Sequence, residues 1–200
     1  MGSTSRTAKI DRKTAETDIR IELDLDGVGD SEIDTGIGFF DHMLTLFAKH
    51  SVTNLKVVAK GDLEVDFHHT VEDVGIVLGQ CLRKALGDKK GIVRYGSSLL
   101  PMDETLARIA LDFSGRPYLV FEAPERIDPI GGNFPFSLVE EFFRAFAFNA
   151  TMNLHATLLY GRDGHHMAEA LFKGVARAAD QAMRVDERIA GRIPSTKEAL

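Results

Sequence analysis

His68-His69-Thr70-Val71-Glu72 and His165-His166-Met167-Ala168-Glu169 are two copies of one pattern, a histidine doublet followed by a glutamate. A single copy would arise by chance in roughly one or two chains in a hundred of this composition, so only the repetition is informative. If each copy opens a helix, its first histidine and its glutamate stand four residues apart on one helix face. The repetition therefore predicts a duplicated fold in which each half presents a face of candidate metal ligands.

The repeat extends beyond these two patterns. When the patterns are aligned and the second copy is allowed two fewer residues in its last hairpin, Asn54-Leu55 stands opposite Asn153-Leu154 and His42 stands opposite Glu141. His42 and Glu141 precede their respective histidine doublets by 26 and 24 residues, a difference equal to the shortening. The alignment adds both residues to the candidate ligands.

Hydrophobic periodicity predicts a similar order of elements in the two halves. In the first half we expect strands at 18–26, 54–60 and 63–67, with helices at 39–50 and from 68 to about 86. In the second half we expect strands at 92–95, 107–113, 118–121 and 153–160, with helices near 137–152 and from 165 to about 183. Each half is interpreted as a strand-strand-helix-strand-strand-helix unit.

These units predict an α+β fold, an internally duplicated two-layer unit of sheet and helices. The halves are expected to pack about a pseudo-twofold axis, with sheets on one side and helices on the other. Because loops are short and no linker separates the halves, residues 1–200 are interpreted as one domain. The repeats would span about 6–90 and 91–186, followed by a tail at 187–200.

Composition narrows the class of protein. With 200 residues, 44% of them hydrophobic, the chain can bury a proper core. A net charge of -6 argues against a general nucleic-acid surface, although a few arginines could still gather around a small anion. The sequence has neither a run of eighteen apolar residues nor an apolar signal core, so we expect a cytoplasmic protein without a membrane partner. The lone Cys81 is expected to be a small buried hydrophobe.

The candidate metal ligands number eight and would divide evenly between two sites. Neighbouring histidines of a doublet point about 100° apart on a helix, so one doublet would serve two metals more naturally than one. Imidazole and carboxylate without thiolate favour manganese, iron or zinc. Without the repeat alignment, Glu141 would be read as part of a solvated helix face. The candidate set is His42, His68, His69, Glu72, Glu141, His165, His166 and Glu169.

Several further motifs occur in one order along nearly the whole chain. They are Asp41-His42-Met43-Leu44, Pro101-Met102-Asp103-Glu104-Thr105-Leu106, Ser114-Gly115-Arg116-Pro117-Tyr118 and Pro194-Ser195-Thr196-Lys197. With the two histidine patterns, they resemble the imidazoleglycerol-phosphate dehydratase family. The resemblance implies a manganese enzyme of histidine biosynthesis that converts imidazoleglycerol phosphate to imidazoleacetol phosphate. It also implies a ribosomal protein S5 domain 2-like fold and a homo-24-mer whose subunits share metal sites.

The resemblance further implies two manganese ions per subunit and a division of the ligands. One set would be His42, His69, His165 and Glu169, and the other would be His68, Glu72, Glu141 and His166. Family members commonly have Glu-His-Phe-Phe where this chain has Glu140-Glu141-Phe142-Phe143. Carboxylate oxygen is also a good manganese ligand, so the site can survive this change, and Glu140 is the alternative ligand.

Roles in catalysis and substrate binding are likewise implied by the resemblance. Glu16 would move protons in the reaction, and Glu169 is the second catalytic candidate. The phosphate would be bound by Arg94, Arg116, Lys173, Ser195 and Lys197, and Thr196 would also contact the substrate. The rest of the substrate would contact Glu16 and the ligands His42, His68, His69, Glu72 and His165. Taken alone, Glu16 resembles an exposed turn carboxylate.

Two other functions use much of the same chemistry. A dinuclear phosphohydrolase would need similar ligands and would release inorganic phosphate. A metal-storing or structural cage would keep the ligands but would need neither Glu16 nor the phosphate-binding cations. A nucleic-acid module, suggested by the ribosomal-type fold alone, is disfavoured by the acidic balance.

Overall fold

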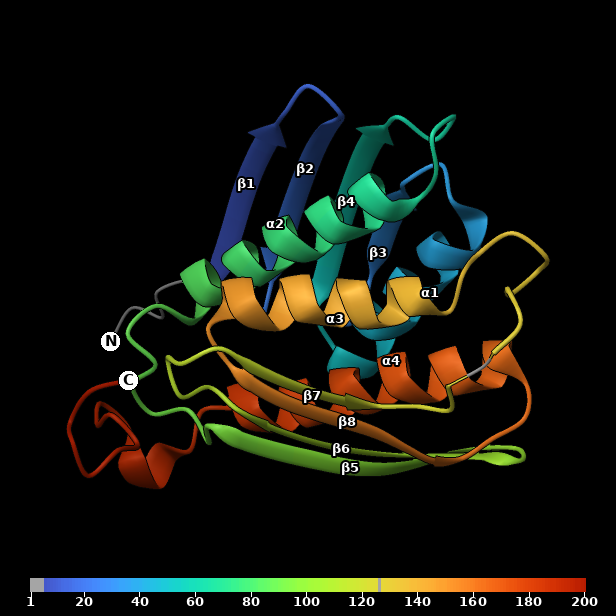
Figure 1. Cartoon of the computed structure of the whole chain (residues 1–200). Coiled ribbons are helices and arrows are strands. Elements are labelled where there is room, and N and C mark those ends of the chain that lie inside the picture. The colour runs from blue at the N-terminus through green and yellow to red at the C-terminus, as the bar shows by residue number, and fades with distance from the viewer. Residues whose placement is uncertain (1–5, 126) are drawn as a thin grey trace.

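Each half of the chain forms a four-stranded sheet with two helices, as the computed structural model shows for residues 6–125 and 127–200 (Figure 1). The first half contains β1 Thr7–Lys13, β2 Thr17–Asp24, β3 Ser31–Asp34, α1 Gly38–Ser51, β4 Asn54–Gly61 and α2 His68–Leu86. The second contains β5 Tyr95–Met102, β6 Thr105–Asp112, β7 Tyr118–Glu122, α3 Ser137–Ala150, β8 Asn153–Tyr160 and α4 Gly164–Met183. A short 3-10 helix, η1 Glu187–Ile189, follows.

The two sheets have the same topology. Their strand orders are β1-β2-β4-β3 and β5-β6-β8-β7, and only the β3–β4 and β7–β8 pairs are parallel. The registers also agree, since Asp24 pairs with Asn54 in one sheet and Asp112 pairs with Asn153 in the other. This equivalence confirms the duplicated α+β fold. It also extends the repeat alignment to the β1–β2 and β5–β6 hairpins.

The element order within each half differs from the prediction. Three strands precede the first helix of each half and one strand separates its helices, giving β-β-β-α-β-α. The expected strand at 63–67 is wrong: Val65 N donates to Asp62 O in a turn, and Leu63 and Phe67 are apolar because they pack against the core. The short β3 was missed because four residues carry too little periodicity to identify a strand.

The strand expected at 92–95 begins only at Tyr95 and continues through Met102. Ile92 instead forms an isolated antiparallel bridge with Val185, near the end of α4. Burial alternates along β5, and its exposed side chains lie on the face away from α4. The sequence of β5 therefore has too few regularly spaced apolar residues to be identified as a strand. The apolar segment at 92–95 thus joins the C-terminal part of α4 to the second sheet.

The sheets lie on opposite sides of the helices, not together on one side as expected (Figure 1). α2 covers β1 and β2, α4 covers β5 and β6, and the helices pack together as the pairs α2–α3 and α1–α4. Each sheet has one apolar face that its own helices must cover, and the remaining apolar helix faces then meet one another. In this shared core the ring of Phe142 lies 5.4 Å from Phe40 of α1 and 5.0 Å from Phe172 of α4.

Two glycines allow α2 to approach α3 closely. A methyl group at Gly75 would lie 2.9 Å from the carbonyl oxygen of Phe142, and one at Gly79 would lie 2.5 Å from that of Phe146. Backbone atoms cannot move aside as a flexible side chain can, so any larger residue would push the helices apart. This close contact fixes the distance between the first turns of α2 and α3, which carry candidate ligands.

Across the described ranges, 6–125 and 127–200, no helix is long and apolar enough to cross a membrane.

Candidate metal centre and substrate site

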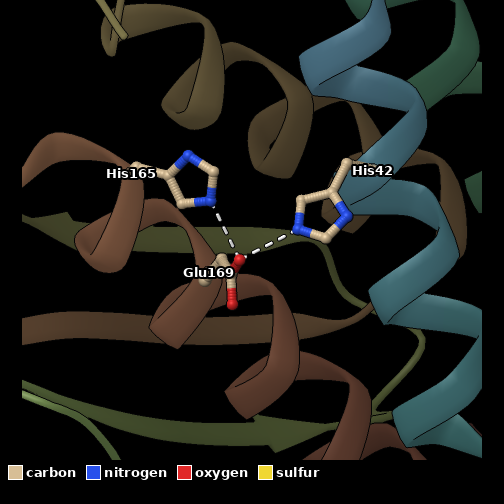
Figure 2. Close-up of side chains that lie close together, drawn as sticks. All are labelled: His42, His165 and Glu169. Atoms are coloured by element: carbon tan, nitrogen blue, oxygen red, sulfur yellow. Dashed lines mark hydrogen bonds and ion pairs between the residues drawn. The ribbon is translucent and has the colours of Figure 1, made fainter. Parts of the chain in front are cut away.

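Three candidate ligands converge where α1 meets α4 (Figure 2). The Nε2 atoms of His42 and His165 each lie 2.9 Å from Oε1 of Glu169, and both rings point toward that carboxylate. Among the described residues, this is the one group of three or more candidate ligands whose donor atoms all lie within 4.8 Å of one another. We call it the triad.

The negative charge of Glu169 is stabilised by Lys173 and by the two histidines of the triad. Lys173, one helical turn beyond Glu169 on α4, donates a hydrogen bond to Oε2 of the carboxylate. Burial raises the pKa of Glu169, but hydrogen bonds from Lys173, His42 and His165 outweigh it and lower the pKa to about 2. The side chain is only 9% exposed, so an ionised carboxylate is held in a largely buried position. Two imidazole nitrogens and one carboxylate form a donor set that suits manganese, iron or zinc.

The start of α4 fixes the direction of its histidines. Asp163 is the N-cap, and its side chain accepts a hydrogen bond from the backbone N–H of His166. The rings of His165 and His166 are 89° apart, and those of His68 and His69 on α2 are 88° apart. The contacts of the second doublet differ as well, since Nε2 of His165 lies 2.9 Å from Glu169 whereas Nδ1 of His166 lies 2.8 Å from Glu104.

His69 and His166, the second histidines of the two doublets, lie outside the triad and are held by carboxylates. Nδ1 of His69 donates to Oδ2 of Asp62 at 3.0 Å, and Nδ1 of His166 donates to Oε2 of Glu104 at 2.8 Å. The hydrogen bond that His69 donates to Asp62 raises the pKa of His69, and the one that His166 donates to Glu104 raises the pKa of His166. The single chain thus does not bring either histidine to the three donors assembled at Glu169.

The second predicted ligand set is less assembled than the first. Nε2 of His68 lies 3.9 Å from Oε2 of Glu72, one turn along α2. Oε1 of Glu141, on the first part of α3, lies 3.6 Å from Nε of Arg144. The alternative ligand Glu140 also faces Arg144, with Oε1 accepting from Nη2 at 2.6 Å. Both glutamates of the pair thus face Arg144, one helical turn further along α3.

Glu16 lies in the turn between β1 and β2, beside His69. Its Oε1 is 3.9 Å from Nε2 of His69, and its side chain is 55% exposed. The backbone N–H of Glu16 donates to the hydroxyl oxygen of Thr14, which shapes the turn. The Glu16 carboxylate is therefore exposed to solvent on a hydrogen-bonded turn, next to the imidazole of His69.

The residues expected to bind phosphate lie in two places. Arg94 donates to both carboxylate oxygens of Asp112 and, through Nη1, to the carbonyl oxygen of Pro194 at 2.7 Å, immediately before Ser195. A methyl group at Gly115 would lie 2.5 Å from the carbonyl carbon of Leu200, so the end of the chain packs beside Arg116. The C-terminal segment 194–200, which contains Ser195, Thr196 and Lys197, therefore lies close to both Arg94 and Arg116.

Lys173 lies at the triad, where besides its bond to Glu169 its Nζ is 3.6 Å from the sulfur of Met102. Sequence reasoning gave no role to Asp62, Glu104 or Asp112, the carboxylates that hold His69, His166 and Arg94. Only Glu104 left a usable signal: Thr17 and Thr105 begin the equivalent strands β2 and β6, so Glu104 is the repeat counterpart of Glu16.

Comparison with known proteins gives a consistent result. The family model described as imidazoleglycerol-phosphate dehydratase matches residues 35–179. Proteins of that name are 60% identical in Akkermansia muciniphila and 59% identical in Caldanaerobacter subterraneus, each over 195 residues, covering 98% of this chain and 100% of the relative.

Solved structures agree. The crystal structure of imidazoleglycerol-phosphate dehydratase from Staphylococcus aureus matches with a TM-score of 0.81 and 44% identity, covering 90% of this chain and 99% of that one. The structure of the Pyrococcus furiosus protein matches with a TM-score of 0.81 and 34% identity, covering 96% of this chain and 100% of that one. On this likeness over nearly its full length, and on the family model that covers most of it, the chain belongs to the imidazoleglycerol-phosphate dehydratase family.

Proposed function

We propose that this hydro-lyase of histidine biosynthesis uses two manganese ions per subunit to remove water from imidazoleglycerol phosphate and form imidazoleacetol phosphate. The reaction follows from membership of the family. The observation that supports a metal is the triad, in which two imidazole nitrogens and a buried carboxylate converge within 4.8 Å. We also propose a cytoplasmic location, which suits a biosynthetic enzyme with a small phosphorylated substrate.

We propose that the metal ligands are shared between subunits of a homo-24-mer. One chain assembles three members of the first set, His42, His165 and Glu169, while its own His69 is held elsewhere by Asp62. Since the two halves are related by the repeat, the corresponding members of the second set are Glu141, His68 and Glu72, with His166 as the one held elsewhere. A neighbouring subunit that supplied its His69 or His166 would complete each set.

The metals, when bound, would supply Lewis acidity at the nitrogens of the substrate's imidazole ring. The protein has to bind the phosphate and move protons. Loss of a carbon-bound proton and of a hydroxyl group gives an enol, which becomes the ketone by a further proton transfer. Glu16 has an exposed carboxylate beside His69 and is the group that we assign to these transfers. Arg94 positions the tail segment through Pro194, and Arg116, Ser195, Thr196 and Lys197 supply donors for the phosphate.

The test is to incubate the manganese-loaded protein with imidazoleglycerol phosphate and to follow imidazoleacetol phosphate and free phosphate separately. We expect metal-dependent ketone formation without phosphate release, and its loss after chelation. Phosphate release would instead favour a phosphohydrolase. Neither product from a metal-replete, assembled sample would favour a structural cage.

Glu16→Gln is the matched test of the proton-transfer assignment. We expect kcat to fall by about 10²–10⁴-fold, the usual contribution of a positioned general acid or base. Glu32→Gln is the control, because Glu32 is an exposed carboxylate paired with Lys56 on the outer part of the first sheet. An unchanged kcat in Glu16→Gln would remove Glu16 from the mechanism.

A further inference from the structure

We propose that Glu104 and Asp62 are positioning residues that fix the ring nitrogens of His166 and His69, so that Nε2 of each is presented to a metal. The proposal rests on the manganese function proposed above. It assigns a role to two carboxylates that are neither metal ligands nor substrate-binding groups in that proposal.

The contacts of Glu104 place its two oxygens in different roles. Oε1 accepts hydrogen bonds from the backbone N–H groups of Arg162 at 3.3 Å and Asp163 at 3.0 Å, and so ties the β5–β6 turn to the start of α4. Oε2 accepts from Nδ1 of His166 at 2.8 Å. The carboxylate is thus anchored by backbone groups before it reaches the imidazole.

A carboxylate also accepts a hydrogen bond from Nδ1 of His69, but it comes from another place in the repeat, and among the described residues no backbone N–H group donates to it. Asp62 directly follows β4, whereas Glu104 lies between β5 and β6. The repeat counterpart of Glu104 is Glu16, which lies 3.9 Å from Nε2 of His69, at the other side of the ring. Because non-equivalent positions supply the carboxylate in the two halves, the arrangement is not simply a remnant of the duplication.

The chemical consequence concerns the imidazole tautomer. An ionised carboxylate can only accept a hydrogen bond, so Nδ1 of each histidine must carry the proton and Nε2 of the neutral ring keeps its lone pair. Nε2 of His166 is 3.9 Å from the nearest carboxylate oxygen of Asp103, too far for a hydrogen bond. Both rings therefore offer Nε2, the same atom that His42 and His165 direct at Glu169. Carboxylates in this position orient metal-binding histidines and increase their basicity.

Glu104→Gln tests the role of Oε2 with little change in shape. The amide can still accept the backbone bonds with its oxygen, but its NH₂ group would then face Nδ1 of His166 and favour the wrong tautomer. We would titrate metal-free wild type, Glu104→Gln and the control Glu32→Gln with manganese, and follow free manganese by electron paramagnetic resonance. We expect two sites in all three proteins, with one site about 10–100-fold weaker in Glu104→Gln.

A double-mutant cycle separates positioning from support of the helix. His166→Ala should weaken the same site, and Glu104→Gln should cause no further loss in that background. If Glu104 only held the start of α4, the site containing His165 and Glu169 would weaken as well, because they lie on the same helix. That result, or unchanged affinity at both sites, would overturn the proposal.

The failure of the proposed function would look different. A wild-type protein without two manganese sites would end the metal assignment itself, whatever the variants do. Thermal unfolding of the metal-free proteins checks that Glu104→Gln folds. If it does not fold, Asp62→Asn makes the same prediction in the other half, where one site should weaken and His69→Ala should mask the effect.

Discussion

Replacing Gly79 by alanine should force α2 and α3 apart. The new methyl group would lie 2.5 Å from the carbonyl oxygen of Phe146 and 2.9 Å from the backbone nitrogen of Ala150, about 0.9 Å short of an ordinary 3.4 Å contact with that oxygen. Overpacking of this kind costs about 1–3 kcal/mol, and contacts with backbone favour the upper end. Alanine returns about 1 kcal/mol of helix propensity, which leaves about 2 kcal/mol of net destabilisation.

The assay is thermal unfolding of the metal-free protein, because bound metal would add its own stabilisation. For a chain of this size about 2 kcal/mol lowers Tm by about 4–8 °C. Gly38→Ala is the control: Gly38 starts α1, its added methyl group would meet nothing within 4 Å, and Tm should not fall. Glu72 on α2 and Glu141 on α3 are proposed ligands of one metal, so Gly79→Ala should also weaken manganese binding at that site. A Gly79→Ala protein that melts at or above wild type would refute this account of the helix contact.

Three further predictions concern the tail, the metals and the cysteine. Deleting residues 195–200 should strongly reduce kcat/KM for imidazoleglycerol phosphate while leaving Tm nearly unchanged, since the tail carries proposed phosphate donors. A large fall in Tm, or an unchanged kcat/KM, would contradict this. Chelation should lower the particle mass measured by light scattering if ligands bridge subunits, and an unchanged mass after verified metal removal would exclude bridging as the cause of assembly. Cys81 is fully buried, and burial raises its pKa to about 12, so the native protein should resist a thiol reagent at pH 8 and show one reactive thiol per chain after unfolding. Rapid reaction of the native protein would mean that α2 opens readily.

The duplication and most elements could be predicted because they are local patterns. Helical spacing identified α1 and the histidine patterns identified the starts of α2 and α4, each within about a residue. The repeat alignment of His42 with Glu141 is matched by the equivalent positions of these residues on α1 and α3. Such patterns are visible because they recur every few residues or at one fixed interval.

The contacts between distant segments could not be predicted in this way. The sequence contains no periodic signal that joins Glu104 to His166, 62 residues away, or Asp62 to the ring of His69 in preference to the nearer Asp66. The segment 63–67 was predicted as a strand because a loop that packs against the core and a short strand contain the same apolar residue types. The ligand sets themselves were divided by family resemblance, not by spacing.

The triad is built from residues of both repeats. His42 comes from the first repeat, whereas His165 and Glu169 come from the second. Neither repeat contains the whole triad, so the site exists only where the two halves pack together. His42 and Glu141 occupy equivalent places in α1 and α3 but differ, and Glu16 is exposed where its repeat counterpart Glu104 is anchored by backbone N–H groups, so the two halves carry different side chains on one shared framework.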